Sequence, residues 1–255
     1  MNSANDDATK KQSQSLVIEI NKLKKSFKNN HVLKGVDLTL KKGESVVVLG
    51  KSGSGKSVLI KCIVGLLRPD SGTLKVFEKS VLELNHQELD KIREKIGFVF
   101  QSNALYDSMT VRKNLEFPLR RHLENESKEQ INQRVKTALS SVGLLNTIDM
   151  MPSELSGGMR KRIGLARCLI LNPEVMLYDE PTTGLDPITA EEISKLMMDM
   201  QKKYNSSSII ITHDMKCAKL TANQMLVLID GLIYAKGTYA ELEKSKDKKI
   251  KAFFE

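Results

Sequence analysis

The stretch that most constrains this fold is VVVLGKSGSGKS, residues 46–57, where an apolar run leads directly into a glycine-rich turn. The apolar run predicts a buried strand, and SVLIKCIVGLL, residues 57–67, has the pattern of a helix. Glycines in the connecting turn let the backbone pass close to a ligand without a side-chain clash. Backbone N–H groups and the helix dipole then converge on one point, which is typical of a phosphate-binding turn.

Two polar residues begin the predicted helix. Lys56 would place its ammonium on the β- and γ-phosphates of a nucleotide, and Ser57 would offer its hydroxyl to Mg²⁺. The alternative is a purely structural glycine-rich turn, which the flanking strand and helix disfavour. The residues expected to bind ATP are Gly50, Lys51, Ser52, Gly53, Ser54, Gly55, Lys56 and Ser57.

Strand-like and helix-like segments alternate along the chain. Apolar runs typical of buried strands lie at 16–20, 44–50, 96–100, 174–179, 208–212 and 225–230, and helical patterns lie at 56–67, 157–171 and 187–203. This alternation predicts an α/β fold in which helices cover a parallel or mixed sheet. Residues 16–40, which include the alternating VDLTL, are expected to add an antiparallel β flank.

The chain is expected to contain one main domain with an insertion and two tails. The main domain spans 16–245, and its residues 103–155 carry helical patterns without a strand, which predicts a helical subdomain. Residues 1–15 are polar and are expected to be disordered, and residues 246–255 are expected to form a basic tail. Phe253 and Phe254 in that tail can pack on this core or on a second chain, and the sequence leaves both open.

The run VMLY, residues 175–178, is followed by two acidic residues. Asp179 stands at the carboxyl end of a predicted strand, where open α/β sheets bind ligands, and it suits Mg²⁺. Glu180 can orient or deprotonate an attacking water. Gln101 and His213 also follow predicted strands, and Asp186 lies in TTGLDP, so the same crevice is expected to hold all of them.

A second turn suited to phosphate lies in ELSGGM, residues 154–159. Ser156, Gly157 and Gly158 stand before a helical pattern, and a hydroxyl, bare N–H groups and a helix dipole together attract an anion. Ser156 can equally cap that helix, with the same geometry. One chain therefore carries two phosphate turns of different kinds.

Composition excludes several other classes. The three cysteines, Cys62, Cys168 and Cys217, form no CxxC pair, which indicates reduced thiols rather than disulfides or zinc ligands. No apolar run reaches the roughly 20 residues needed to cross a bilayer, and the first fifteen residues lack a signal-peptide core. The net charge of +9 fits nucleic acid, an anionic membrane or an anionic ligand, but aromatic residues are only 5% of the chain, which disfavours a base-stacking surface.

Taken in order, Gly50–Ser57, Gln101, LSGGM, YDEP, GLDP and THD resemble the ATP-binding subunits of ABC (ATP-binding cassette) transporters over residues 16–245. The resemblance implies a P-loop NTPase domain of ABC type, with ATP and Mg²⁺ as cofactors and ATP hydrolysis coupled to transport. It also implies a head-to-tail pair of copies with two ATPs between them. In that pair, Ser156, Gly157 and Gly158 of one copy contact the γ-phosphate held by the other.

The resemblance implies a role for each remaining site residue. Glu180 is implied as the general base, His213 as a γ-phosphate switch, and Asp186 as a link between the two copies. Phe27, in LKKSFKNNHVL, stands where relatives stack an aromatic ring on adenine. The implied metal ligands are Ser57, Gln101 and Asp179, with Gln101 also contacting the water.

Three stretches further resemble the Mla-type (maintenance of lipid asymmetry) ATPases: QSNALYDSMTVRKNLEFPL, MPSELSGGMRKRIGLAR and DEPTTGLDPITA. Most importer cassettes carry proline and glutamine where this chain has Asp107 and Met159. The resemblance implies permease subunits, an MCE (mammalian cell entry) protein, phospholipid cargo moving between inner and outer membranes, and a place at the cytoplasmic face of the inner membrane. The alternatives are another ABC importer, a soluble ABC ATPase, and a P-loop kinase, which LSGG disfavours.

Leu105, Tyr106 and Met109 form an apolar group close to Gln101 in sequence. They can pack within the helical subdomain. They can instead form a groove that receives a short helix from a membrane subunit. The sequence leaves both interpretations open.

Overall fold

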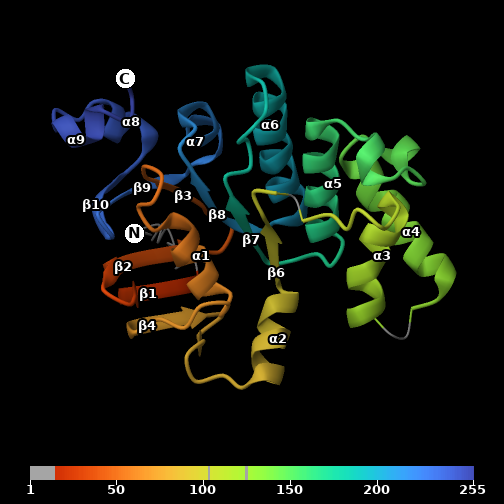
Figure 1. Cartoon of the computed structure of the whole chain (residues 1–255), viewed down its shortest axis with the longest axis horizontal. Helices are drawn as coiled ribbons and strands as arrows, with labels where there is room; N and C mark the ends of the chain where they lie inside the picture. Colours follow the sequence, from red (N-terminus) through yellow and green to blue (C-terminus); the bar gives the residue numbers. More distant parts are fainter. Residues whose placement is uncertain (1–14, 103, 124–125) are drawn as a thin grey trace, which may run out of the picture.

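The computed structural model describes residues 15–102, 104–123 and 126–255, and it has the predicted α/β fold with a mixed and an antiparallel sheet (Figure 1). The predicted disordered tail, residues 1–15, lies outside the described residues except for Ser15.

The central sheet has six strands and carries the P-loop. Its order is β10 (Leu232–Gly237), β9 (Gln224–Ile229), β3 (Ser45–Leu49), β8 (Ser207–Thr212), β7 (Val175–Asp179) and β6 (Ile96–Val99). The pairs β9–β3, β3–β8, β8–β7 and β7–β6 are parallel, and β10 pairs with β9 in antiparallel fashion. Because parallel strands end at one edge of a sheet, the residues after β3, β6, β7 and β8 meet there.

The predicted antiparallel flank is a separate four-stranded sheet. Its order is β2 (Asn30–Lys41), β1 (Leu16–Phe27), β4 (Ser71–Val76) and β5 (Lys79–Ser80). The sequence analysis did not predict β4, β5 or β10. Each is short, and half or more of its residues are exposed or half-buried, so none forms a continuous apolar run.

Helices cover both faces of the central sheet, because successive strand residues point to opposite sides. The nine helices within the described residues are α1 (Lys56–Ile63), α2 (His86–Glu94), α3 (Val111–His122), α4 (Lys128–Ser141), α5 (Gly157–Leu169), α6 (Pro187–Tyr204), α7 (Met215–Thr221), α8 (Tyr239–Glu243) and α9 (Lys248–Lys251). Val46 and Val48 of β3 belong to one core, with α1 and the antiparallel sheet. Val47 and Leu49 belong to a second core, with α5, α6 and α7.

The stretch predicted as a helical subdomain, 103–155, contains α3, α4 and two short 3-10 helices, Leu145–Thr147 and Pro152–Glu154. No strand occurs among its described residues. Leu115, Leu119 and Val135 of α3 and α4 form a third core with Ile163 of α5, so α5 joins this region to the main sheet.

Residues 246–255, the predicted basic tail, include the short helix α9 and pack on the domain. Ile250 of α9 is buried, and Phe253 and Phe254 pack against the second core of their own chain. The Phe254 ring lies 5.3 Å from that of Tyr239 in α8. The sequence left open whether this pair packs on its own core or on a second chain, and the structure shows it on its own core.

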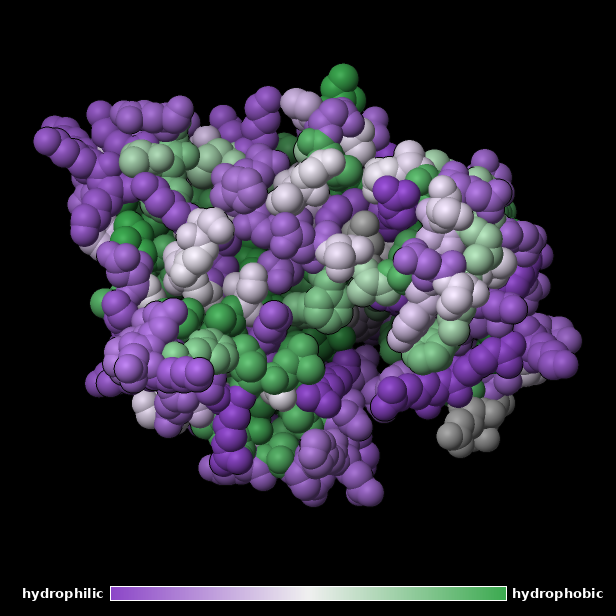
Figure 2. Space-filling view, viewed as in Figure 1, coloured by the Kyte–Doolittle hydropathy of each residue, from purple (hydrophilic) through white to green (hydrophobic). Residues whose placement is uncertain are grey.

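Hydrophilic residues dominate the face shown in Figure 2, and hydrophobic residues gather on it around α1 and α2. Leu66, just after α1, is 53% exposed. Within residues 15–102, 104–123 and 126–255, no helix has both the length and the apolarity needed to span a membrane.

Candidate functional site

The P-loop runs from the end of β3 into α1, as predicted, and two glycines fix its path. A Cβ on Gly50 would collide with the Ser54 hydroxyl and would lie 2.8 Å from the Leu228 carbonyl oxygen. Gly55 has φ of +104°, in the region that favours glycine, and a Cβ there would lie 2.9 Å from Leu33 Cδ2. A larger residue at either position would displace the loop.

Lys56 is buried, and its ammonium contacts both the P-loop backbone and the carboxylate of Glu180. Its Nζ donates to the carbonyl oxygens of Gly50 at 2.7 Å and Lys51 at 3.3 Å. It also forms an ion pair with Glu180 Oε1 at 3.3 Å. The P-loop charge and the predicted general base are therefore in direct contact.

Two of the three expected magnesium ligands, Ser57 and Asp179, lie side by side. Ser57 Oγ donates to Asp179 Oδ1 over 3.1 Å. Burial raises the pKa of the Asp179 carboxyl, and the Ser57 hydrogen bond acts in the opposite direction. Two oxygens at this separation, one of them from a buried carboxylate, fit a divalent cation that prefers oxygen ligands.

Glu180 is held from several directions. Its Oε2 accepts from Thr183 Oγ1 at 3.3 Å and from the His213 backbone N–H at 3.3 Å, and it lies 2.8 Å from His213 Nδ1. Its φ is +50° although Pro181 follows, a conformation that is rare before proline. The carboxylate thus has a fixed position beside Lys56 and His213.

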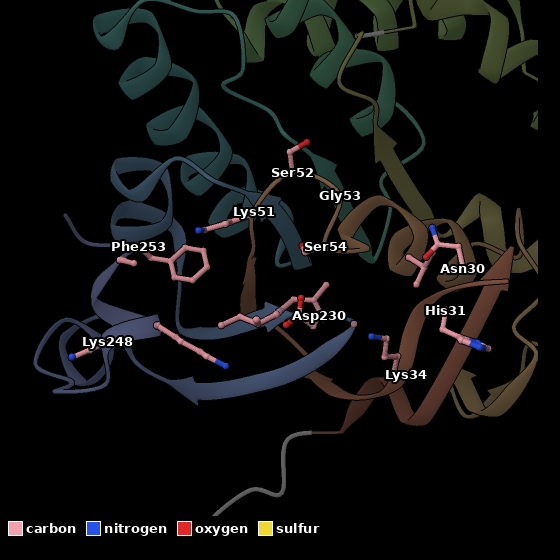
Figure 3. Close-up of a pocket in the computed structure, with 16 residues that line it drawn as sticks. Asn30, His31, Lys34, Lys51, Ser52, Gly53, Ser54, Asp230, Lys248 and Phe253 are labelled. Carbon is pink, nitrogen blue, oxygen red and sulfur yellow. The ribbon is translucent and has the colours of Figure 1, made fainter.

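A cavity of about 440 Å³, which we call the P-loop cavity, brings most of the predicted ATP residues together. Its lining includes Phe27, Ser52, Gly53, Gly55, Lys56, Ser57, Gln101, Glu180 and His213. The Phe27 ring is 44% exposed, and Lys25 Nζ lies 5.4 Å from its centroid. Lys51 and Ser54 instead line a neighbouring cavity (Figure 3).

Sequence reasoning missed Lys161 and Thr183. Lys161 Nζ donates to the Gln101 backbone carbonyl at 2.7 Å, which positions the loop after β6. Burial lowers the pKa of Lys161, whereas the negative charges of Asp179 and Glu180 act to raise it. Nothing at its place in the helical pattern signals this role, because its partner lies sixty residues away.

The turn Ser156–Gly158 opens α5, and Ser156 caps it by accepting from the Met159 backbone N–H at 3.2 Å. Asp186 caps α6 in the same way and also accepts from Thr189 Oγ1 at 2.6 Å, a bond that lowers the pKa of its carboxyl. Both turns line one cavity of about 500 Å³, which we call the signature cavity. It shares no lining residue with the P-loop cavity.

Tyr106 of the predicted apolar group lies on the surface. It is 44% exposed, and its ring centroid lies 5.1 Å from that of Phe117, which is 41% exposed. Leu105 is half-buried against the third core. The structure therefore shows Leu105 packed within the subdomain and Tyr106 exposed to solvent.

Comparison with known proteins gives one family. The profile of the ABC transporter family matches residues 33–183. The probable ribonucleotide transport ATP-binding protein mkl of Mycobacterium tuberculosis is 41% identical over 211 residues, covering 83% of this chain and 58% of that protein. The methionine import ATP-binding protein MetN of Helicobacter acinonychis is 40% identical over 228 residues, 89% of this chain and 69% of MetN. The chain therefore spans a little under three-fifths of the mycobacterial relative.

Comparison with solved structures points to the same family. A dimeric ATP-binding cassette in a post-hydrolysis state, bound to ADP and Pi, superposes with a TM-score of 0.80 at 32% identity, over 87% of this chain and 98% of that one. With the matched family profile, the shared fold and the P-loop geometry together, the chain belongs to the ABC transporter family and is one of its ATP-binding cassettes.

Proposed function

We propose that this chain binds ATP with Mg²⁺ and hydrolyses it. The observation that carries the proposal is that Lys56, Ser57 and Glu180 line one cavity, with Asp179 hydrogen-bonded to Ser57 and Glu180 paired with Lys56. Ser57 and Asp179 would hold the metal, and Lys56 and the P-loop backbone would hold the phosphates. Bound Mg²⁺ would neutralise charge on the β- and γ-phosphates.

Glu180 is the proposed general base, and its contacts explain how it is controlled. In the structure, Oε1 is paired with Lys56, and Oε2 accepts from the Thr183 hydroxyl and the His213 backbone N–H. A phosphate that binds Lys56 competes with this ion pair and leaves Oε1 available to accept a proton from water. His213, whose side chain is largely exposed, is placed to donate to the same phosphate.

The test is ATP hydrolysis by Glu180→Gln, which keeps the shape of the side chain and removes its basicity. We expect the rate to fall about 10²- to 10⁴-fold with ATP binding retained. Glu243→Gln, at an exposed position in α8, is the matched control and should hydrolyse ATP at the normal rate. A Glu180→Gln variant with unchanged hydrolysis would refute the assignment.

The signature cavity supports a paired arrangement. Ser156, Gly157, Gly158 and Asp186 lie in a cavity with no residue in common with the P-loop cavity, so one chain does not bring both turns onto one phosphate. Two copies placed head to tail would do so. We propose that the turn Ser156–Gly158 of one copy, the signature turn, contacts the ATP held by the other copy. Asp186 of the first copy lines the same cavity as this turn.

The exposed Tyr106 and Phe117 support a permease contact. Their rings form an exposed aromatic pair on the helical subdomain, the kind of surface on which one face of a short amphipathic helix can pack. Tyr106→Asp should abolish binding to the membrane subunit and leave ATP binding intact, because Tyr106 does not line the P-loop cavity. Loss of ATP binding or of folding in this variant would argue against a docking role.

For the cargo, we propose phospholipid, moved between inner and outer membranes by permease subunits and an MCE-type protein with this chain at the cytoplasmic face of the inner membrane. Asp107 and Met159 support this interpretation. The names of the relatives, which mention ribonucleotide transport and methionine import, favour the alternative of a polar-solute importer.

Gentle-detergent purification of the chain from its native membranes, with mass spectrometry of bound proteins and lipids, separates these outcomes. Recovery of a permease with an MCE protein and phospholipid would support the lipid proposal. Recovery of a permease with a soluble binding protein would support the importer alternative. Recovery of no membrane protein would refute both and favour a soluble ATPase.

A further inference from the structure

A second cavity adjoins the P-loop and is larger than the proposed ATP site. Its volume is about 750 Å³, within the range of about 300–1,000 Å³ that holds small-molecule ligands. Its lining comes from the start of β2, the first half of the P-loop, the β9–β10 turn and α9 with the residues after it (Figure 3). It adjoins the P-loop cavity, with which it shares Val32, Ser52 and Gly53, but Phe27, Lys56, Ser57 and Glu180 do not line it.

The charges on this cavity favour an anion. Four lysines line it, Lys34, Lys51, Lys248 and Lys249, against a single carboxylate, Asp230 (Figure 3). All four lysines are exposed. Within the described part of the chain, none of them lies at ion-pair distance from a carboxylate. Lys249 Nζ lies 5.1 Å from the centroid of the Tyr234 ring, and the other three lysines have their charges available to a ligand.

The rest of the lining is apolar and includes one aromatic ring. Val32, Leu228, Ala252 and Phe253 lie among the basic side chains. A flat, partly apolar group would bury surface here, and an aromatic ring favours another ring. Asp230 adds an acceptor for a hydroxyl or amino group, as acidic residues do for ribose in other nucleotide sites.

The wall formed by α9 is held in place, so the cavity exists without a ligand. Asp247 caps α9 by accepting from the Lys249 and Ile250 backbone N–H groups at 2.8 and 3.3 Å. It also accepts from Tyr234 Oη at 2.7 Å, which ties α9 to β10. Ile250 is buried in the second core.

We propose that this cavity is a second ligand site for a nucleoside monophosphate. The lysines would bind the phosphate, Asp230 a ribose hydroxyl or base amino group, and Phe253 the base. Ser52 and Gly53 line both this cavity and the P-loop cavity. A ligand here therefore contacts the loop that holds ATP.

The test uses AMP, which lacks the β- and γ-phosphates that Lys56 would bind. Calorimetric titration of the intact chain should detect AMP binding, and Lys248→Ala/Lys249→Ala should weaken it about tenfold or more, as expected for lost charge-assisted hydrogen bonds. The matched control is Lys244→Ala/Lys246→Ala, which removes equal charge from the same segment outside the cavity. It should bind AMP as the natural chain does.

Photolabelling with 8-azido-AMP, followed by peptide mapping, distinguishes the two cavities. We expect adducts within residues 248–253. Adducts confined to Phe27 and its neighbours, equal AMP affinity in the two double variants, or no AMP binding would each overturn the proposal. None of these results bears on ATP hydrolysis at the P-loop, which is tested separately by Glu180→Gln.

Discussion

Asn114 of α3 is fully buried and holds the loop that carries Tyr106. Its side-chain oxygen accepts from the Tyr106 backbone N–H at 2.8 Å. Its amide donates to the carbonyl oxygens of Tyr106, Met109 and Thr110 at 3.0–3.1 Å. The amide has two hydrogens, so at most three of these four bonds form at full strength together.

Asn114→Ala should therefore cost about 2–4 kcal/mol of unfolding free energy, at about 0.5–1.5 kcal/mol for each lost bond. That loss would lower Tm by about 5–15 °C in a chain of this size. Calorimetry with Asn132→Ala as the matched control measures it, because Asn132 is half-buried in the same subdomain and accepts one bond, from Arg112 Nη1. Equal Tm values for the two variants would refute the reasoning. ATP binding should survive Asn114→Ala, and permease binding should weaken.

Three further predictions follow from local geometry. Gly55→Ala should lose ATP binding in equilibrium dialysis, because its φ of +104° and the contact with Leu33 oppose any side chain; normal binding would contradict this. Ser156→Ala should lose about 1 kcal/mol as a helix cap and most ATPase activity while its own P-loop still binds ATP. Burial raises the pKa of the Cys62 and Cys217 thiols to about 11, from 9.0, so unfolded thiols ionise first and the free energy of unfolding should fall as pH rises through this range. Denaturant titrations from pH 8 to 11 would show it, and a constant free energy would contradict it.

The P-loop and the central strands were predictable because their signals are local. The path of the loop itself requires Gly50 and Gly55. The strand residues VVVL are buried on both faces of the sheet, so they form one continuous apolar run in the sequence. Asp179 and Glu180 follow from the same logic, since they come directly after a buried strand.

Residues whose partners lie far away in sequence were not predictable. Lys161 is a buried polar residue within a helix, and its acceptor, the Gln101 carbonyl, lies sixty residues away and comes into reach only in the folded chain. The position of Phe253 likewise depends on the second core, which strands and helices from the whole chain assemble.

The central claim is that the signature turn acts on ATP bound by another copy, and mixing two inactive variants tests it. Lys56→Met damages the P-loop and leaves Ser156 intact, whereas Ser156→Ala does the reverse. In a mixed pair, one site combines an intact P-loop with an intact signature turn from the other copy. We predict that the mixture hydrolyses ATP although neither variant does so alone. A mixture as inactive as its components, with both variants folded and able to pair, would contradict the account.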